Sequence, residues 1–325
     1  MVEFRKNYSV DYVLAFSFVV AIIYAVVLSG LKIDSFVDRD NYLIYAEHSS
    51  DILARYVSEG ALSVIFNEPA WLFLNILLSS FFLPDVVLRV IIFFSAFLTC
   101  FYVLRFKAKY FFVLLFFLLL PQVLKNNIIH LRQGLAISFF LIGYFSSRSG
   151  LRWAFIGLSS LIHASFLFLV LLFFINQLFT IYRYSIGLRV LFISLLSITV
   201  GGGGMWIARV LGARQGEGGQ SVDVSGLGFM FWLAVAVLFF SQGKQFLKSN
   251  GFAYSILLFY LLTYFFLPVT ARIFESGMIL VLLAGLSLDS YRKLSFFAAL
   301  FFYFCVQWYQ RAGLPGFGWG VENYL

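Results

Sequence analysis

Long apolar runs separated by short polar stretches make up most of this chain of 325 residues. A bilayer core of ~30 Å needs about 20 consecutive apolar residues in a helix, so each long run is a candidate membrane span. Because backbone polar groups in lipid must be satisfied within the segment, spans of this kind are helical. The sequence predicts an all-α polytopic membrane protein with about ten to twelve transmembrane helices. The runs cover residues 11–30, 86–104, 110–124, 133–147, 152–175, 188–207, 226–242, 252–268, 273–289 and 294–309.

The composition indicates the same class, because 62% of the residues are hydrophobic and only 12% are charged. A soluble domain of this length would lack the polar surface to cover itself. The net charge of +8 is spread between the apolar runs, so it predicts orientation in a membrane rather than nucleic-acid binding. Cys100 and Cys305 lie inside apolar runs, without disulfide or metal-ligand spacing. We therefore expect the lipid bilayer as a partner and no nucleic acid.

We expect one transmembrane domain over residues 1–325, because no fixed period repeats and no linker divides the chain. Residues 31–68 form a polar stretch that should be an external loop, since the basic N-terminus marks the other side of the first span. The apolar segment 69–83 is short and begins at a proline, so it is a candidate interfacial or re-entrant helix. Residues 208–226 are rich in glycine and predict a second external loop.

Basic clusters between the runs test the topology, because Lys and Arg are enriched in cytoplasmic loops. All the clusters can face the cytoplasm only if segment 69–83 does not cross and one further crossing exists. A break of the run around His163 into two short helices is the simplest source of that crossing. We expect at least one interrupted or re-entrant helix, whose irregular backbone must be satisfied by protein or a wet cavity. The clusters lie at residues 105–109, 148–152, 183–189, 244–248 and 292–293.

Four ionisable residues stand out among the apolar runs. An Arg, Lys or Asp at the centre of a membrane helix costs about 2.5–3.5 kcal/mol, so such residues are functional candidates. Glu68 precedes a proline at the start of an apolar segment, and Arg132 lies in a polar stretch between two runs. His163 interrupts an apolar stretch, and Arg272 lies where two late runs meet. We take these four as the candidate catalytic residues.

Each candidate also has a purely structural interpretation. Glu68 can be a helix-start carboxylate favoured by the helix dipole, and Arg132 can extend its charge to the membrane interface. His163 can be a packed helix residue that donates to a carbonyl one turn back. Arg272 can be neutralised by Glu275 three residues later on the same helix face, and we interpret Glu275 itself as structural.

The four candidates share a chemistry. Arginine matches phosphate oxygens and remains charged when buried, whereas a carboxylate and an imidazole can transfer protons. This set suits a substrate that carries phosphate and a reacting hydroxyl. The sequence contains no Walker loop, no GxSxG motif and no cluster of metal-ligand residues, so we expect no cofactor and no metal.

At these residues the chain resembles the bacterial polysaccharide polymerases of the Wzy and EpsG type, which build O-antigen and exopolysaccharide. The resemblance rests on the order of several short motifs and on the ten residues that separate Arg132 from Gly143. The motifs are DRDNYLIY at residues 38–45, Glu68-Pro69, LRQGLA at 131–136, IHAS at 162–165 and Ala271-Arg272.

The resemblance implies a fold like that of the C-type glycosyltransferases and a reaction at the outer face of the bacterial inner (plasma) membrane. A glycan on undecaprenyl diphosphate would be transferred, without a metal, to the terminal sugar hydroxyl of a lipid-linked oligosaccharide repeat unit. A chain-length regulator is a further candidate partner. In our hypothesis Arg132 and Arg272 hold the diphosphate, while Glu68 or His163 takes the proton from the acceptor hydroxyl, with Asp40 as a weaker candidate.

Residues beside these groups are expected to contact the substrate. Tyrosines there can stack on sugars or anchor the chain at the membrane interface. Two alternative functions remain open: a flippase or transporter of the same lipid-linked unit, and a membrane O-acyltransferase with His163 as base near Asn126 or Asn127. The expected substrate-binding residues are Asp40, Tyr42, Tyr45, Asn127, His130, Gln133 and Arg214.

Overall fold

The computed structural model describes residues 9–210, 226–267 and 269–321. The named elements of this part of the chain are all helices, and one isolated antiparallel bridge joins Phe36 to Gly320. The all-helical class is therefore confirmed for the described residues. The first half contains α1 (Ser9–Ser29), η1 (Ile33–Ser35), α2 (Arg39–Glu59), α3 (Ala61–Phe66), α4 (Pro69–Ser79), α5 (Pro84–Leu104), η2 (Ala108–Tyr110), α6 (Phe111–Leu118), α7 (Pro121–Ile128) and α8 (Leu131–Phe145).

The second half continues the helical bundle. Its helices are α9 (Ser149–Ile162), α10 (Phe166–Ile181), α11 (Ile186–Val210), α12 (Leu227–Ser241), α13 (Lys244–Ser249), α14 (Gly251–Thr263), α15 (Thr270–Gly285), α16 (Ser290–Arg311) and η4 (Pro315–Gly318). The expected glycine-rich loop at 208–226 falls almost entirely outside the described residues.

Two helices of the described chain are long and apolar enough to cross a membrane, namely Tyr12–Ser29 within α1 and Pro84–Leu104, which is α5. A third crossing is available if the bent pair formed by α6 and α7 counts as one span. Several shorter helices are also apolar, and large hydrophobic side chains such as Phe112 and Phe94 are exposed on the outside. An outer surface of this kind is typical of a chain that packs against lipid.

The run at residues 110–124 was expected as a single span, and the structure bends it sharply at Pro121. The stretches Ala108–Leu118 and Pro121–Ile128 lie at 67° to each other. Pro121 occupies the first turn of α7, where its missing N–H is harmless but where the helix cannot extend back through it. The second half of the pair is short and carries buried polar residues into the bundle.

The segment expected as an external loop at residues 31–68 is largely helical instead, with η1, α2 and α3 inside it. The helix was missed because this stretch is rich in charged residues. In α2 these are exposed except for Arg39, which is buried along with Tyr42, Tyr45 and Tyr56. The candidate interfacial segment 69–83 does form a helix, α4, which packs against α2 and α9. Its relation to the bilayer stays a prediction.

The expected interruption near His163 is confirmed. Helix α9 ends at Ile162, His163 has extended backbone angles (φ −148°, ψ 124°), and α10 begins at Phe166. The end of α9 and the start of α10 therefore lie together, and this turn lies next to Glu68, whose carboxylate contacts His163. The break in this apolar run therefore places non-helical backbone beside polar side chains, which can satisfy its hydrogen-bonding groups.

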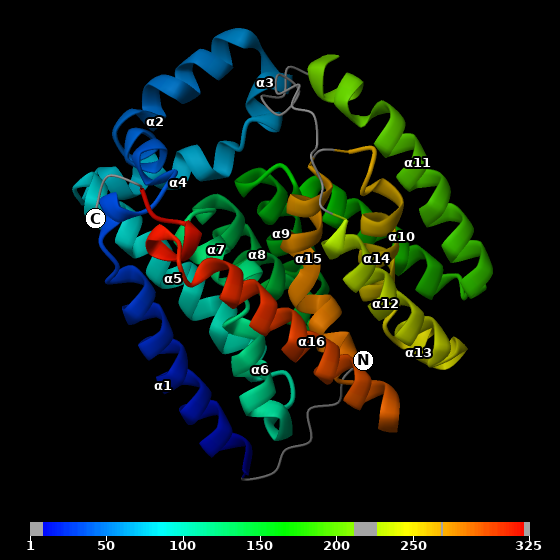
Figure 1. Ribbon diagram of the computed structural model, residues 1–325. Helices are drawn as coiled ribbons and strands as arrows, with labels where there is room; N and C mark the ends of the chain where they lie inside the picture. Colours follow the sequence, from blue (N-terminus) through cyan, green and yellow to red (C-terminus); the bar gives the residue numbers. More distant parts are fainter. Residues whose placement is uncertain (1–8, 211–225, 268, 322–325) are drawn as a thin grey trace.

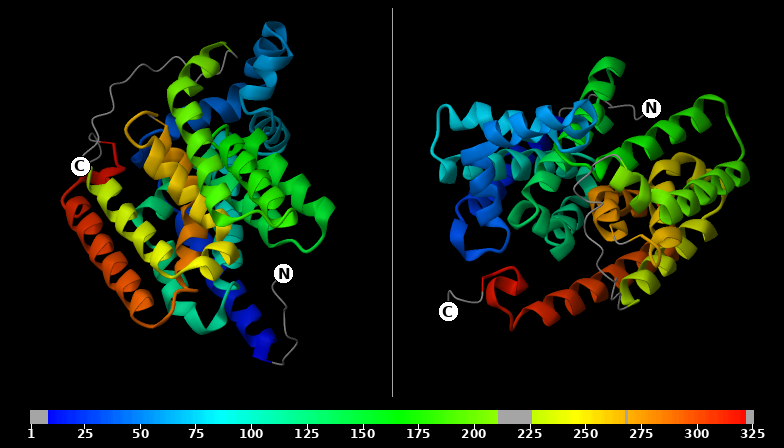
Figure 2. Two further views of the ribbon diagram at one scale, coloured as in Figure 1. Left: turned by 90° about the vertical axis from the view of Figure 1, so that its right-hand side faces the viewer. Right: turned by 90° about the horizontal axis from the view of Figure 1, so that it is seen from above.

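Helices α2 and α3 lie at one end of the bundle, at the top of Figure 1. Three connections meet at the opposite end, where Lys107 Nζ donates to Ser287 Oγ at 3.0 Å and Arg292 Nε donates to Ser241 Oγ at 3.0 Å. Seen from above in Figure 2, the helices α1 to α5 and the helices α10 to α14 occupy opposite sides of the bundle. Helices α7, α8 and α15 lie between these two groups and carry part of the candidate site.

Two glycines fix helix α8 between its neighbours. A Cβ at Gly134 would overlap the backbone oxygen of Asn126 on α7, and a Cβ at Gly143 would lie 2.7 Å from Ile156 on α9. Both positions therefore require a residue without a side chain. The spacing from Arg132 to Gly143 thus has a packing explanation, since this glycine lets α8 approach α9 closely.

Candidate active site

Glu68 occupies a constrained position between α3 and α4. It is the residue before Pro69, its backbone lies in the left-handed region (φ 61°), and the residue is only 4% exposed. Its side chain makes no capping hydrogen bond to α4. The structure thus disfavours the helix-start interpretation, because the carboxylate points away from the helix that it precedes.

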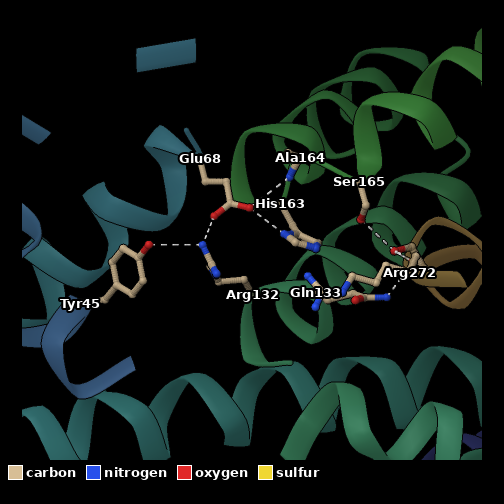
Figure 3. A network of polar contacts seen from close by, with 9 residues as sticks. Tyr45, Glu68, Arg132, Gln133, His163, Ala164, Ser165 and Arg272 are labelled. Carbon is tan, nitrogen blue, oxygen red and sulfur yellow. Dashed lines mark hydrogen bonds and ion pairs between the residues drawn. The ribbon is translucent and has the colours of Figure 1, made fainter. Parts of the chain in front are cut away.

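The Glu68 carboxylate instead joins three other groups, as Figure 3 shows. One oxygen, Oε2, accepts a hydrogen bond and ion pair from Arg132 Nη1. The other, Oε1, lies 2.7 Å from His163 Nδ1 and accepts from the backbone N–H of Ala164 at 3.3 Å. A carboxylate from α4 therefore bridges an arginine on α8 and an imidazole at the α9–α10 break.

The contact with Glu68 orients the His163 ring. If Nδ1 carries the proton and donates it to the carboxylate, Nε2 keeps a lone pair that can accept a proton. His163 also lines a cavity. A histidine held in this way by a buried carboxylate has the arrangement of a general base.

Arg132 lies between the carboxylate and two tyrosines of α2. Its guanidinium carbon is 5.8 Å from the centre of the Tyr42 ring and 5.1 Å from that of Tyr45, and Nη1 donates to Tyr45 Oη at 3.5 Å. Both rings pack edge-on against the buried Trp71. Burial raises the pKa of Tyr42, so its hydroxyl keeps its proton and can donate it to a ligand. These rings hold the guanidinium at the cavity wall.

Arg272 lies in the first turn of α15, as the sequence predicted. Its backbone oxygen accepts hydrogen bonds from Gln133 Nε2 at 3.0 Å and from Ser276 Oγ at 2.9 Å. Within the described residues its guanidinium forms no ion pair. The structural alternative, in which Glu275 neutralises Arg272, is wrong, because Glu275 pairs with Lys125 Nζ at 2.7 Å.

A cavity of about 550 Å³ joins these groups. A volume of this size accommodates a small ligand or part of a larger one. Three arginines and two histidines line it, together with polar and aromatic side chains from residues 38–56. The lining residues are Asp38, Asn41, Tyr42, Ile44, Tyr45, Ile52, Arg55, Tyr56, His130, Arg132, Gln133, His163 and Arg272.

Most of the predicted site residues line this cavity, and Glu68 contacts two of its lining residues, Arg132 and His163. Three further residues are not part of this group. Asp40 is exposed on α2 and does not line the cavity. Asn127 is buried between helices, and its Oδ1 lies 3.2 Å from Ser95 Oγ as a hydrogen-bond acceptor. Arg214 lies outside the described residues. The first two therefore have structural environments different from the expected substrate contacts.

Several cavity residues on α2 were missed by the sequence reasoning, among them Asp38, Arg55 and Tyr56. Asp38 lies four residues before Tyr42, and Arg55 and Tyr56 lie three and four residues after Ile52, which is also a cavity residue. Helical periodicity within residues 38–56 would have grouped them. The signal was overlooked because the stretch was taken as a loop.

No protein-family model, no curated protein and no solved structure matches this chain. Among the described residues, no group of three or more His, Cys, Asp or Glu is arranged to hold a metal ion. What the cavity can do must be inferred from the side chains at it: a buried carboxylate–imidazole pair, three arginines and several tyrosines.

Proposed function

We propose that this chain is a membrane glycosyltransferase that polymerises lipid-linked oligosaccharide repeat units. The observation that carries the proposal is the Glu68 carboxylate, which contacts both Arg132 and His163 at a cavity that Arg272 also lines. A proton acceptor and a phosphate-binding cation thus occupy the same small space. Glycosyl transfer from a diphosphate donor needs both of these groups at once.

In the proposed reaction, His163 Nε2 takes the proton from the acceptor sugar hydroxyl, while Glu68 holds the ring through Nδ1. The acceptor oxygen forms a bond to the anomeric carbon of the donor glycan. The bond from that carbon to the undecaprenyl diphosphate oxygen breaks, and its electron pair leaves with the diphosphate. We assign the base role to His163 rather than to Glu68, since both Glu68 oxygens already accept from other groups.

Arg272 is the better candidate for the leaving diphosphate. Its guanidinium forms no ion pair with the described residues, whereas the charge of Arg132 is balanced by Glu68. An unbalanced guanidinium can bind developing negative charge with two parallel hydrogen bonds. Arg132 then orients the carboxylate and contributes to the phosphate only secondarily.

The aromatic side of the cavity suits the glycan. Tyr42, Tyr45 and Tyr56 of α2 line the cavity, and the Tyr42 and Tyr45 rings lie beside the Arg132 guanidinium. Tyrosine offers a flat apolar face for a sugar ring and a hydroxyl for its polar edge. Asn41 and Asp38 on the same face add amide and carboxylate groups for sugar hydroxyls.

The topology that we propose follows from the break at His163. If α9 and α10 are separate crossings and α4 lies in the interface, all five basic clusters can face the cytoplasm. The cavity then faces the exterior of the inner membrane, with about eleven crossings in all. A cysteine placed at exposed Arg55 would react with an impermeant thiol reagent in intact spheroplasts; protection there would refute this orientation.

The test of function is a profile of lipid-linked oligosaccharides in the native host, with variants expressed in a deletion strain. His163→Ala should lower chain formation by about 10²–10⁴-fold, the range that a general base contributes, while single repeat units still accumulate outside. Arg272→Ala should have the same phenotype. Arg148→Ala, an exposed arginine far from the cavity, is the matched control and should make chains of normal length.

Other outcomes separate the alternatives. Loss of externally exposed units would indicate a flippase, and full-length but unmodified chains would indicate an O-acyltransferase. The acyltransferase alternative has less support, because Asn126 and Asn127 do not line the cavity beside His163. Normal chain length in both His163→Ala and Arg272→Ala would refute the proposed function.

A further inference from the structure

Arg189 is a buried arginine far along the chain from the cavity residues. It lies in the first turn of α11, is 4% exposed, and neither Nε nor Nη1 has a hydrogen-bond partner in the described structure. No ion pair involves it among the described residues. A buried guanidinium with two unpaired nitrogens is costly, since arginine cannot lose its proton to avoid the penalty. Its surroundings should therefore contain a place for a partner.

The guanidinium of Arg189 lies against the first turn of α14. A Cβ built on Gly251, the first residue of that helix, would overlap Arg189 Nη1. Because the Cα–Cβ bond of a helical residue tilts towards the N-terminus, the guanidinium occupies the N-terminal side of this turn. Only glycine leaves room for it there.

The same turn offers backbone donors. The first helical hydrogen bond of α14 runs from Tyr254 N to Asn250 O at 3.0 Å, so the N–H groups of residues 251–253 have no helical acceptor. The N-terminus of a 13-residue helix also carries partial positive charge. A guanidinium packed against it adds like charge, so an anion that both groups contact would offset the repulsion. The combination is that of an anion-binding site.

Neighbouring residues complete the site. Asn176 Oδ1 also lacks a partner and lies 2.8 Å from the position that a Gly251 Cβ would take. Rotation of the Asn176 amide would present its NH₂ group as a further donor. The Phe179 ring packs below the guanidinium, with 5.8 Å between Arg189 Cζ and the ring centre. No carboxylate of the described chain occupies the place of the anion.

We propose that Arg189 and the first turn of α14 form a binding site for a phosphate group, carried by an anionic phospholipid headgroup or present as free phosphate. The helices that form it, α10, α11, α13 and α14, contact one another. Exposed Lys244 and Lys248 on α13 attract anions to the same region. The site is separate from the Glu68 cavity and does not depend on the function proposed for that cavity.

The experiment measures thermal unfolding of the full-length protein in detergent micelles. One arm adds phosphatidylglycerol with phosphatidylcholine as the neutral control, and the other adds inorganic phosphate with chloride at matched ionic strength. Wild-type protein should unfold at a higher temperature with one of the two phosphate sources. A shift with phosphatidylglycerol alone indicates a headgroup, and a shift with inorganic phosphate indicates free phosphate.

Arg189→Gln should weaken the stabilising ligand by about tenfold or more, the factor that one charge-assisted hydrogen bond supplies. Arg183→Gln, which removes an exposed arginine close in sequence, is the matched control and should respond like the wild type. If Arg189→Gln does not fold, Gly251→Ala replaces it, because its Cβ displaces the guanidinium without removing the charge. No response of the wild type to either source, or an unchanged response of the variant, would overturn the proposal.

Discussion

Among the described residues, two ion pairs of low exposure join a Glu to an Arg or Lys of a distant segment, and their settings differ. Glu68, which precedes α4, pairs with Arg132 on α8, and their side chains are 5% and 16% exposed. Lys125 and Glu275 join α7 to α15, with side chains 20% and 11% exposed. Each pair connects segments that are far apart in the sequence. A buried pair costs desolvation in both places, so burial alone does not separate a site from a structural link.

The surroundings of the two pairs do separate them. The Glu68 carboxylate has a third partner, the imidazole of His163, and both Arg132 and His163 line the cavity. At the other pair, neither Lys125 nor Glu275 lines that cavity. We interpret the first pair as part of a reactive site and the second as a link that holds the bent helix α7 against α15. We assign only the first pair to a reactive site because an imidazole and a cavity lie beside it.

The largest effect is expected where the first pair is broken. Glu68→Arg or Arg132→Glu alone should lower the free energy of unfolding by about 3–5 kcal/mol, because each leaves a buried charge without its partner. Each should also abolish the formation of long glycan chains. Unfolding in detergent micelles and the oligosaccharide profile measure the two effects.

The exchanged pair, Glu68→Arg with Arg132→Glu, sharpens the comparison. It should regain part of the stability and none of the function, because an arginine at position 68 cannot accept the hydrogen bond from His163 Nδ1. Long glycan chains in cells carrying the exchanged pair would show that charge balance alone matters at this site.

The second pair should behave in the opposite way. Lys125→Glu or Glu275→Lys alone should again cost about 3–5 kcal/mol of stability. The exchanged pair, Lys125→Glu with Glu275→Lys, should restore both stability and chain formation, because here only the attraction between α7 and α15 is needed. Restored stability without restored chain formation would instead assign these residues to the site.

The sequence was sufficient to predict an all-helical chain with apolar helices and four residues that meet around one cavity. Apolar runs and isolated charges are strong signals, since each follows from the cost of polar groups in lipid. The break at His163 was also predicted, because it was the simplest way for the basic clusters to share one side. Contact partners were harder to predict: the alternative for Glu275 was a pair with Arg272 on its own helix, whereas the structure pairs Glu275 with Lys125. Contacts between distant segments leave no local pattern in a single sequence.

Helix α2 shows a second kind of limit. Its charged residues made residues 31–68 look like a loop, and so the face that carries Tyr56 and Arg55 was overlooked. Burial of that face depends on α4 and α5, which pack against it from later in the chain. This segment forms a buried helical face because of its tertiary packing rather than because of its local helix propensity.

A smaller effect is expected at Gly134, which links the two pairs physically. This glycine lies two residues after Arg132 and packs on the backbone of Asn126, the residue after Lys125. Gly134→Ala should push α7 away from α8 and cost about 1–3 kcal/mol of unfolding free energy, as overpacking does. Gly150→Ala, at a helical glycine with open space around it, is the control and should be close to neutral.

The functional readout of Gly134→Ala tests which pair tolerates movement. Chemistry at a cavity depends on positions held to about 1 Å, whereas a link between helices can follow a small shift. Chain formation should therefore fall by more than the loss of stability explains, when it is compared at a temperature where the variant remains folded. Gly134→Ala combined with the exchanged Lys125 and Glu275 pair should be no worse than Gly134→Ala alone. A further loss in the combined variant would mean that the Lys125–Glu275 link also sets the geometry of the cavity.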